Sequence, residues 1–194
     1  MEFEGRKDGA LTAVQIADNG GALVSNTAGQ YTDAARNGRL FSVANSAAVA
    51  TTAAAATTWT GLGVANPTGS GKLLILLQFG WALSVVGPDE GIIGLMAATD
   101  SDFTAAITVR CAKYAAGASV AYADDGATIV SPVLERVVST YGTGAISTWH
   151  GAGPQVYNID GSIILPPGRA ICTYTTTATT AAFQFSYLWE EVDA

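Results

Sequence analysis

Apolar and polar residues alternate along several short stretches of this chain, and the clearest alternation lies near its C-terminal end. Within residues 182–192, every second side chain from Phe183 to Trp189 is aromatic. The aromatic residues are Phe183, Phe185, Tyr187 and Trp189, while Gln184, Ser186 and Glu190 fall on the opposite face. Because successive side chains of a β-strand point to opposite faces, this pattern predicts a strand whose aromatic face is buried.

The most apolar stretch, residues 72–86, is nearly continuous rather than alternating. A strand that is buried on both faces gives such a pattern. The sequence GPDEG that follows, residues 87–91, has the proline and glycines of a tight turn, and residues 91–98 read as a return strand. Together these stretches predict a β-hairpin.

Further short strands are expected, with turns rich in glycine, proline and polar residues between them. The strands are predicted at 41–46, 106–113, 134–139, 145–149, 161–165 and 170–176, and the turns at 124–126, 141–144, 166–168 and 177–180. The low-complexity stretch SAAVATTAAAATT, residues 46–58, is expected to be extended, because its threonines and lack of charge outweigh the helical preference of alanine. No segment has a strong period of 3.6 residues. The chain is therefore predicted to be all-β, an antiparallel β-sandwich that is jelly-roll-like.

Residues 1–38 differ from the rest, since they carry many charges and small polar residues and have no long apolar period. This pattern predicts an extended N-terminal arm, followed by a sandwich domain over residues 39–194. Two interpretations of the arm stay open. It is either a floppy terminus or a segment that becomes ordered by lying on a neighbouring subunit.

Charged residues make up 13% of the chain, about half the usual share, and apolar residues make up 49%. This composition fits either a domain rich in alanine and threonine or a surface that other subunits cover. The net charge is −7, and the nine basic residues are scattered rather than clustered. Direct binding of nucleic acid or of an anionic membrane is not expected, because both need a basic surface. No apolar run approaches the length of a membrane span, and the N-terminus lacks the apolar core of a signal peptide.

The motif NPTGSGK, residues 66–72, is the one that comes closest to a phosphate-binding loop. A Walker A motif needs a glycine where Asn66 stands and a serine or threonine where Leu73 follows Lys72. It also needs a helix after the loop, whereas a strand is predicted here. The motif is therefore predicted to be a turn into the long apolar strand.

Other residue types with chemical potential lack the partners that chemistry requires. His150 is the only histidine, and no GxSxG elbow accompanies it. The acidic pairs at 89–90, 124–125 and 190–191 fall at expected turns or near the C-terminus, and TDSDF at 99–103 lacks the further ligands of a calcium loop. We expect no catalytic residues, no cofactor and no metal, and hence no enzyme.

The two cysteines, Cys111 and Cys172, each fall in an alternating apolar run and have no metal-site spacing. Two buried free thiols are expected, and a single disulfide stays open. The four tryptophans are Trp59, Trp81, Trp149 and Trp189. Together with the tyrosines they would suit a sugar-binding platform, but Trp81 and Trp189 lie in runs predicted to be buried, which favours packing.

Several segments occur in an order that is typical of one group of viral proteins. They are EFEGRKDG at 2–9, GRLFSVANSAAVATT at 38–52, TGLGVANPTGSGKLLIL at 60–76, YNIDGSIILPPGRAICTYT at 157–175 and FSYLWEEV at 185–192. In this order the chain resembles small structural head accessory proteins of tailed bacteriophages, which decorate or cement the head. The most specific part is the turn DGSIILPPG followed by the terminal strand with WEEV.

The resemblance implies a virion structural protein on the capsid surface, made in the host cytoplasm. Its partners would be the major capsid protein and further copies of itself, in a homotrimer. The function would be mechanical, since subunits bridge neighbouring capsomers and resist the pressure of packaged DNA. We expect the N-terminal arm to reach a neighbour, and the predicted capsid or inter-subunit contact residues are Phe3, Arg6, Lys7, Arg36 and Arg39.

Two alternatives belong to other classes. One is a carbohydrate-binding or host-adhesion module of a phage fibre or head surface, with exposed tryptophans as its platform. The other is a small hydrolase on a sandwich fold, which ranks last because no catalytic constellation can be recognised.

Overall fold

The computed structural model describes residues 3–7, 10–14, 29–83, 90–99, 103–114, 117–141 and 155–194, the first two ranges by their backbone alone. The chain divides into two units, Met1–Asp33 and Ala34–Ala194. The first unit holds an antiparallel hairpin of β1 (Phe3–Lys7) and β2 (Ala10–Val14), which pairs Phe3 with Val14 and Lys7 with Ala10. The short helix α1 (Thr32–Arg36) crosses the boundary between the units, and its Ala34 is buried. Among the residues predicted to form an arm, the structure thus has a hairpin and one helical turn.

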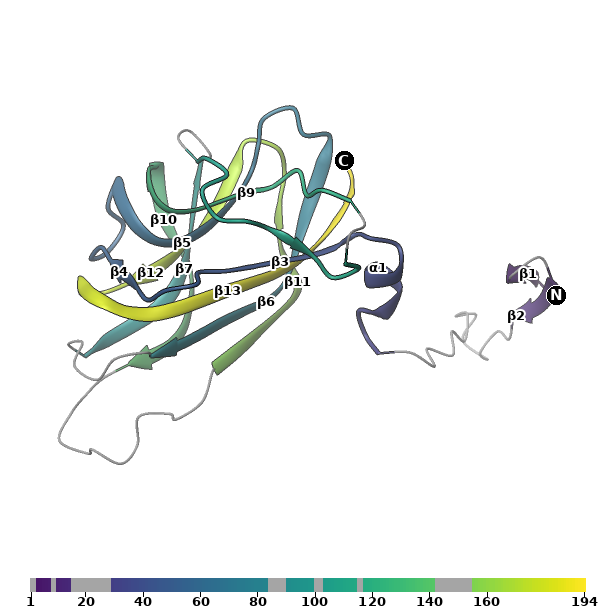
Figure 1. The fold of residues 1–194 in the computed structure, drawn as a ribbon, viewed down its shortest axis with the longest axis horizontal. Coiled ribbons are helices and arrows are strands. Elements are labelled where there is room, and N and C mark those ends of the chain that lie inside the picture. Colours follow the sequence, from purple (N-terminus) through teal and green to yellow (C-terminus); the bar gives the residue numbers. More distant parts are fainter. Residues whose placement is uncertain are drawn as a thin grey trace. The chain divides into compact units, whose positions relative to one another are not determined.

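The second unit is a sandwich of two antiparallel β-sheets, as the sequence predicts (Figure 1). One sheet has five strands in the order β10-β7-β12-β5-β9, and the other has the order β11-β6-β13-β3-β8, with β4 paired to β13. The bounds are β3 (Leu40–Ala44), β4 (Val49–Thr51), β5 (Thr58–Asn66), β6 (Lys72–Leu83), β7 (Gly91–Thr99), β8 (Arg110–Cys111), β9 (Tyr122–Thr128), β10 (Val130–Tyr141), β11 (Gln155–Leu165), β12 (Arg169–Thr175) and β13 (Thr179–Asp193).

The strand pairs are nested in a jelly-roll-like way. β5 pairs with β12, β6 with β11, and β7 with β10, so early strands pair with late ones in reverse order. The first and third of these pairs belong to the five-stranded sheet, and the second belongs to the other sheet. This is the arrangement of a long hairpin wound around a barrel-like core. It places β10 and β11 at the edges of their respective sheets.

The main core lies between the sheets and is built on the aromatic face of β13. Phe183, Phe185, Tyr187 and Trp189 are each at most 2% exposed, which confirms the predicted buried face. Phe79 of β6 adds to them, with its ring centroid 5.9 Å from that of Phe185 and 5.1 Å from that of Tyr187. Aromatic rings in these tilted and offset arrangements contribute beyond the area that they bury.

A second apolar cluster covers the outer face of the five-stranded sheet. Its residues alternate along the strands with core residues, as Ala65 does with Val64 and Cys172 with Ile171. Trp59 and Phe103 lie over this face, with ring centroids 6.0 Å apart. The members are Trp59, Ala65, Met96, Ala98, Phe103, Ile129, Ala170 and Cys172. The central strands β5, β7 and β12 of this sheet are therefore buried on both faces.

The predicted hairpin of residues 72–98 is wrong. Its two strands exist as β6 and β7, but β6 belongs to the six-stranded sheet and β7 to the five-stranded one. Strands that face each other across a core bury apolar side chains just as paired strands do, so the pattern does not separate the two cases. Residues 84–86 of the predicted strand and 87–89 of the predicted turn lie outside the described residues.

Two further predictions between β7 and β10 are corrected. The expected turn at 124–126 lies inside β9, where the pairing with β5 shifts register; there the buried Asp124 carboxylate accepts hydrogen bonds from the backbone N–H groups of Asp125 and Gly126 and from Thr104. The expected strand at 106–113 is reduced to β8, although Ile107 still packs against the core. The predicted strand at 145–149 and most of the turn at 141–144 lie outside the described residues.

The remaining predicted strands are confirmed, some with longer bounds. Residues 41–46 correspond to β3, 134–139 to β10, 161–165 to β11 and 170–176 to β12. The turns at 166–168 and 177–180 separate β11, β12 and β13, although β13 already begins at Thr179. The extended interpretation of residues 46–58 also holds, since this stretch contains β4 and the start of β5.

Gly63 gives a test of the outer cluster. A Cβ at this position would lie 2.7 Å from the Phe103 ring and 2.9 Å from Trp59, whereas a Cβ at Gly126 in β9 would meet its nearest atoms at 3.6 Å. We expect Gly63→Ala to lower the free energy of unfolding by about 1–3 kcal/mol, because two buried rings must shift. Gly126→Ala is the matched control and should change it by less than about 0.5 kcal/mol in urea unfolding. Equal effects of the two substitutions would contradict the packing described.

Tyr187 gives a test of the main core. Its hydroxyl is buried and has no hydrogen-bond partner among the described residues, and burial, followed by interaction with Cys172, raises its pKa well above 10. As the pH rises past about 10, this hydroxyl ionises in the unfolded chain while it stays protonated in the folded chain, so stability falls. Tyr187→Phe should raise the free energy of unfolding by about 1 kcal/mol at pH 7. The substitution should also reduce the fall in the free energy of unfolding between pH 9 and 11. An unchanged fall at alkaline pH would contradict this account.

Candidate functional site

The five predicted contact residues are divided between the two units. Phe3, Arg6 and Lys7 belong to β1. Arg36 is exposed at the end of α1, and Arg39 is exposed just before β3. The Arg39 Nε atom lies 3.1 Å from Glu190 Oε1 of β13, so this guanidinium already has an internal partner. In the second unit, Arg36 is therefore the better placed of the predicted residues for an outside contact.

The loop of residues 66–72 is used as a turn, as predicted. Asn66 is fully buried and donates from Nδ2 to the carbonyl oxygens of Lys72 at 2.7 Å and of Leu165 at 2.8 Å. Its Oδ1 accepts a hydrogen bond from Ser70 Oγ at 2.6 Å. The Lys72 ammonium binds the Asp193 carboxylate at 2.6 Å, and this bond lowers the Asp193 pKa. Asn66, the residue that departs from the Walker A pattern, thus joins the end of β5 to the loop at 70–72 and to the end of β11.

Two buried acidic side chains, Glu191 and Asp124, hold the fold together. Glu191 is 5% exposed and accepts hydrogen bonds from Trp189 Nε1 at 3.2 Å, from the Val120 backbone N–H at 3.3 Å and from the Ser119 hydroxyl. Asp124 ties the segment after β7 to β9 through Thr104. Across the described ranges, no three histidine, cysteine or acidic side chains gather as they would around a metal ion. His150 and Trp149 lie outside the described residues.

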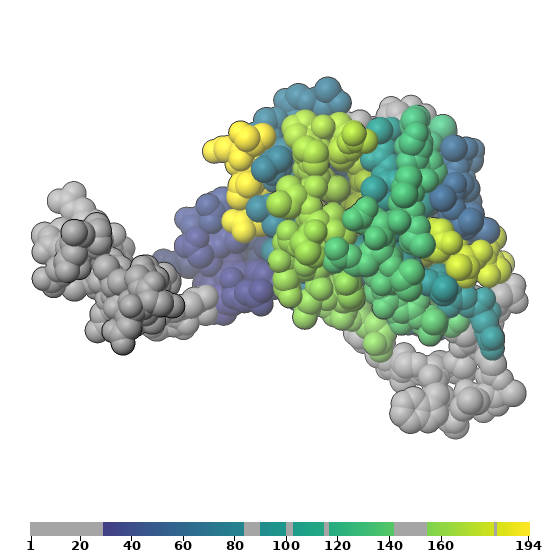
Figure 2. Space-filling model, turned by 180° about the vertical axis from the view of Figure 1, so that it is seen from behind, coloured from purple at the N-terminus to yellow at the C-terminus, as the bar shows by residue number. Residues whose placement is uncertain are grey.

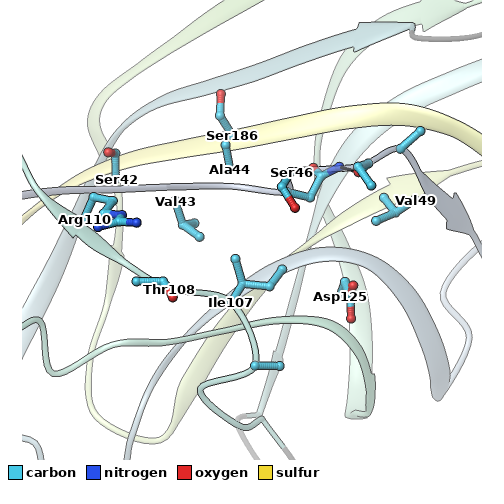
Figure 3. Close-up of a pocket in the computed structure, with 14 residues that line it drawn as sticks. Ser42, Val43, Ala44, Ser46, Val49, Ile107, Thr108, Arg110, Asp125 and Ser186 are labelled. Carbon is cyan, nitrogen blue, oxygen red and sulfur yellow. Dashed lines mark hydrogen bonds between the residues drawn. The ribbon is translucent and has the colours of Figure 1, made fainter.

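A groove of about 680 Å³ opens beside the outer edge of β3 (Figure 3). β8 pairs with β3 only at Phe41 and Ser42, and the two segments diverge beyond that point. Arg110 lies at one end of the groove and Asp125 at the other, and most of the other lining residues are small alanines and serines. The residues that line it include no histidine and no cysteine, so the groove offers a strand edge and hydroxyl groups rather than a nucleophile with its base.

The most distinctive surface is an apolar strip along two neighbouring edge strands. We call it the β10/β11 flank, and its exposed fractions are Val130 49%, Val133 61%, Leu134 41%, Val137 55%, Val156 59% and Ile164 49%. Elsewhere in the described residues, the exposed large hydrophobic side chains are Tyr114 and Tyr122. Figure 2 shows β10 in green beside β11 in yellow-green. A concentration of this kind marks interaction surfaces more often than bare solvent-facing ones.

The flank is continuous across the two sheets. Arg136 Nη1 of β10 donates to Ser162 Oγ of β11 at 2.8 Å. A shallow pocket of about 260 Å³ also joins them, with Val133 on one side and Ile164 and Pro166 on the other. The two strands thus present one surface, although they belong to different sheets.

The sequence pattern alone did not reveal the flank. Strict alternation over 134–139 puts Leu134 and Val137 on opposite faces, yet both are exposed. The reason is that the register of β10 against β7 shifts between Leu134 and Arg136 and again between Val137 and Ser139. Such β-bulges redirect the side chains that follow them. The one available signal was Pro132, which favours an edge strand.

The three described tryptophans are internal. Trp59 and Trp189 are at most 1% exposed and Trp81 is 9% exposed, which confirms packing for Trp81 and Trp189.

Comparison of the chain with protein-family models, curated proteins and solved structures finds no match. In the part of the chain that the structure describes, no helix has the length and apolar character to cross a membrane.

The two cysteines are free and differ in access, which resolves the disulfide left open by the sequence. Cys172 is fully buried as predicted, and burial raises the pKa of its thiol, whereas Cys111 of β8 is only half-buried, which corrects the prediction of a second buried thiol. Since the thiolate is the reactive form, a chromogenic disulfide reagent should label one thiol per native chain and two in denaturant. Cys111→Ser should abolish the native reaction, and labelling that persists in this variant would contradict the assignment.

Proposed function

We propose that this chain is a virion structural protein, a cement or decoration subunit on the head of a tailed bacteriophage. It would stabilise the head by bridging subunits of the major capsid protein, in company with further copies of itself. The observation that carries the proposal is the β10/β11 flank, six exposed apolar side chains on a chain with few charges. The resemblance of its segments to head accessory proteins adds the particular setting.

The physical argument is one of many weak contacts. Burial of apolar surface contributes about 25 cal/mol per Å² before the costs of association are subtracted. A single small contact is therefore weak, but a shell that repeats it many times gains a large total. A subunit of this kind must also transmit load without deforming. The long strand pairings of β6 with β11 and β13 give it a stiff frame.

The first unit supplies a different kind of contact. Phe3, Arg6 and Lys7 lie on a hairpin that is separate from the sandwich unit. Basic side chains favour an acidic partner surface and speed encounter with it. We assign this unit, together with Arg36, to contact with the capsid or with a neighbouring subunit.

The test is occupancy of expanded, DNA-free capsid shells by the full-length chain and by an Arg6→Glu/Lys7→Glu variant. We expect the variant to bind at least tenfold more weakly, because two attractive contacts become repulsive. A second variant that begins at residue 32 retains α1 and the buried Ala34, and it should lose binding while its thermal midpoint stays within about 3 °C.

The same assay supplies the control variant and the results that would contradict the proposal. Lys113→Glu/Arg110→Glu carries the same charge change on the sandwich unit and should bind shells like the unaltered chain. Undiminished occupancy by the two N-terminal variants would remove the first unit from the proposal. Failure of the unaltered chain to bind shells at all would remove the proposed function.

A further inference from the structure

We infer that the β10/β11 flank binds a second copy of this chain, through packed side chains and not through an added β-strand. The inference rests on the proposed function, since it names the partner that an assembly subunit meets at this surface. Three features of the flank carry it. They are its apolar side chains, its balance of charge and the irregular backbone of both edge strands.

The apolar side chains are spread over both strands. Val133, Leu134 and Val137 come from β10, and Val156 and Ile164 come from β11, each between 41% and 61% exposed. Two copies can pack these apolar side chains against each other, because each copy offers both the protruding side chains and the shallow pocket between Val133 and Ile164. A contact with a second copy removes them from water on both chains at once.

The charge balance selects the partner. The flank carries Glu135 and Arg136 on β10 and Asp160 on β11, and Arg169 at the start of β12 lines the shallow pocket within it, so the formal charge of the flank with its pocket is zero. The whole chain has a net charge of −7, and two copies therefore repel each other over most orientations. At the flank, each copy presents acids and bases that the other copy can match. This is the self-complementarity that a contact between identical chains requires.

The irregular backbone of β10 and β11 opposes strand addition. Register shifts interrupt the pairing of β10 at 130–133, 134–136 and 137–139, and the pairing of β11 at 158–163. Pro132 removes one more N–H donor from the β10 edge. Bulges and proline are the devices by which proteins keep an edge strand from recruiting another strand. The second copy is therefore held by side chains alone.

The experiment measures the mass of the full-length chain in solution by light scattering and sedimentation over a hundredfold range of concentration. We expect a mass of two chains, and a shift of at least tenfold in the dissociation constant for Val137→Glu. Tyr114→Glu is the matched control, because Tyr114 is 93% exposed and lies off the flank. It adds the same charge and should leave the mass unchanged.

A charge exchange tests the partner directly. Glu135→Lys brings the formal charge of the flank to +2, and Arg169→Glu brings it to −2. Arg169 is substituted rather than Arg136 because Arg136 already donates a hydrogen bond to Ser162 within its own chain. Each variant alone should associate more weakly than the unaltered chain, and an equimolar mixture should recover the association. A mixture that stays as weak as its components would overturn the inference.

The outcomes separate this inference from the proposed function. A chain that is monomeric throughout, or a Val137→Glu variant with unchanged mass, overturns the inference. If such a monomer binds shells and Val137→Glu abolishes that binding, the flank faces the capsid and the proposed function stands without the inference. If the chain associates through the flank but does not bind shells, the inference stands and the proposed function fails.

Discussion

The burial of one aromatic strand face determines most of this structure. β13 pairs with β6 from Phe183 to Asp193 and with β3 along its opposite edge, so it occupies the middle of its sheet. With its four aromatic rings fixed in the core, β6 must present its other edge to β11. The nested pairing then brings β10 to the edge of the opposite sheet, beside β11. The position of the flank thus follows from the winding of the strands around β13.

The scarcity of charge has one cause that lies inside the fold. Part of the neutral polar composition is internal. The hydroxyl of Thr175 donates to that of Thr51, which lies 2.8 Å from that of Thr179, and all three residues are buried. Buried hydroxyl groups form hydrogen bonds with buried backbone groups and with each other. They therefore avoid the desolvation cost of buried ions. This accounts for threonines in the interior, but it does not account for valines and a leucine on the flank.

Sequence reasoning succeeded where a side chain's direction depends only on its own strand. The alternation of 182–192 predicted the buried rings correctly, and the turn at 66–72 followed from local chemistry. It failed where two strands had to be assigned to a sheet, as for β6 and β7, because facing and pairing leave the same apolar pattern. The flank was missed for a different reason, since the bulges of β10 are set by its pairing with β7.

The combination of apolar side chains with a blocked edge has a consequence for assembly. An open edge strand can add further chains without limit, and such growth ends in fibres. Side-chain contacts between identical surfaces close on themselves, because each copy uses the same patch that it offers. With bulges in β10 and β11 and with valine, leucine and isoleucine exposed on them, the proposed contact would be driven by apolar burial and protected from open-ended growth. The proposed role, a subunit that covers a surface of fixed size, would need both properties together.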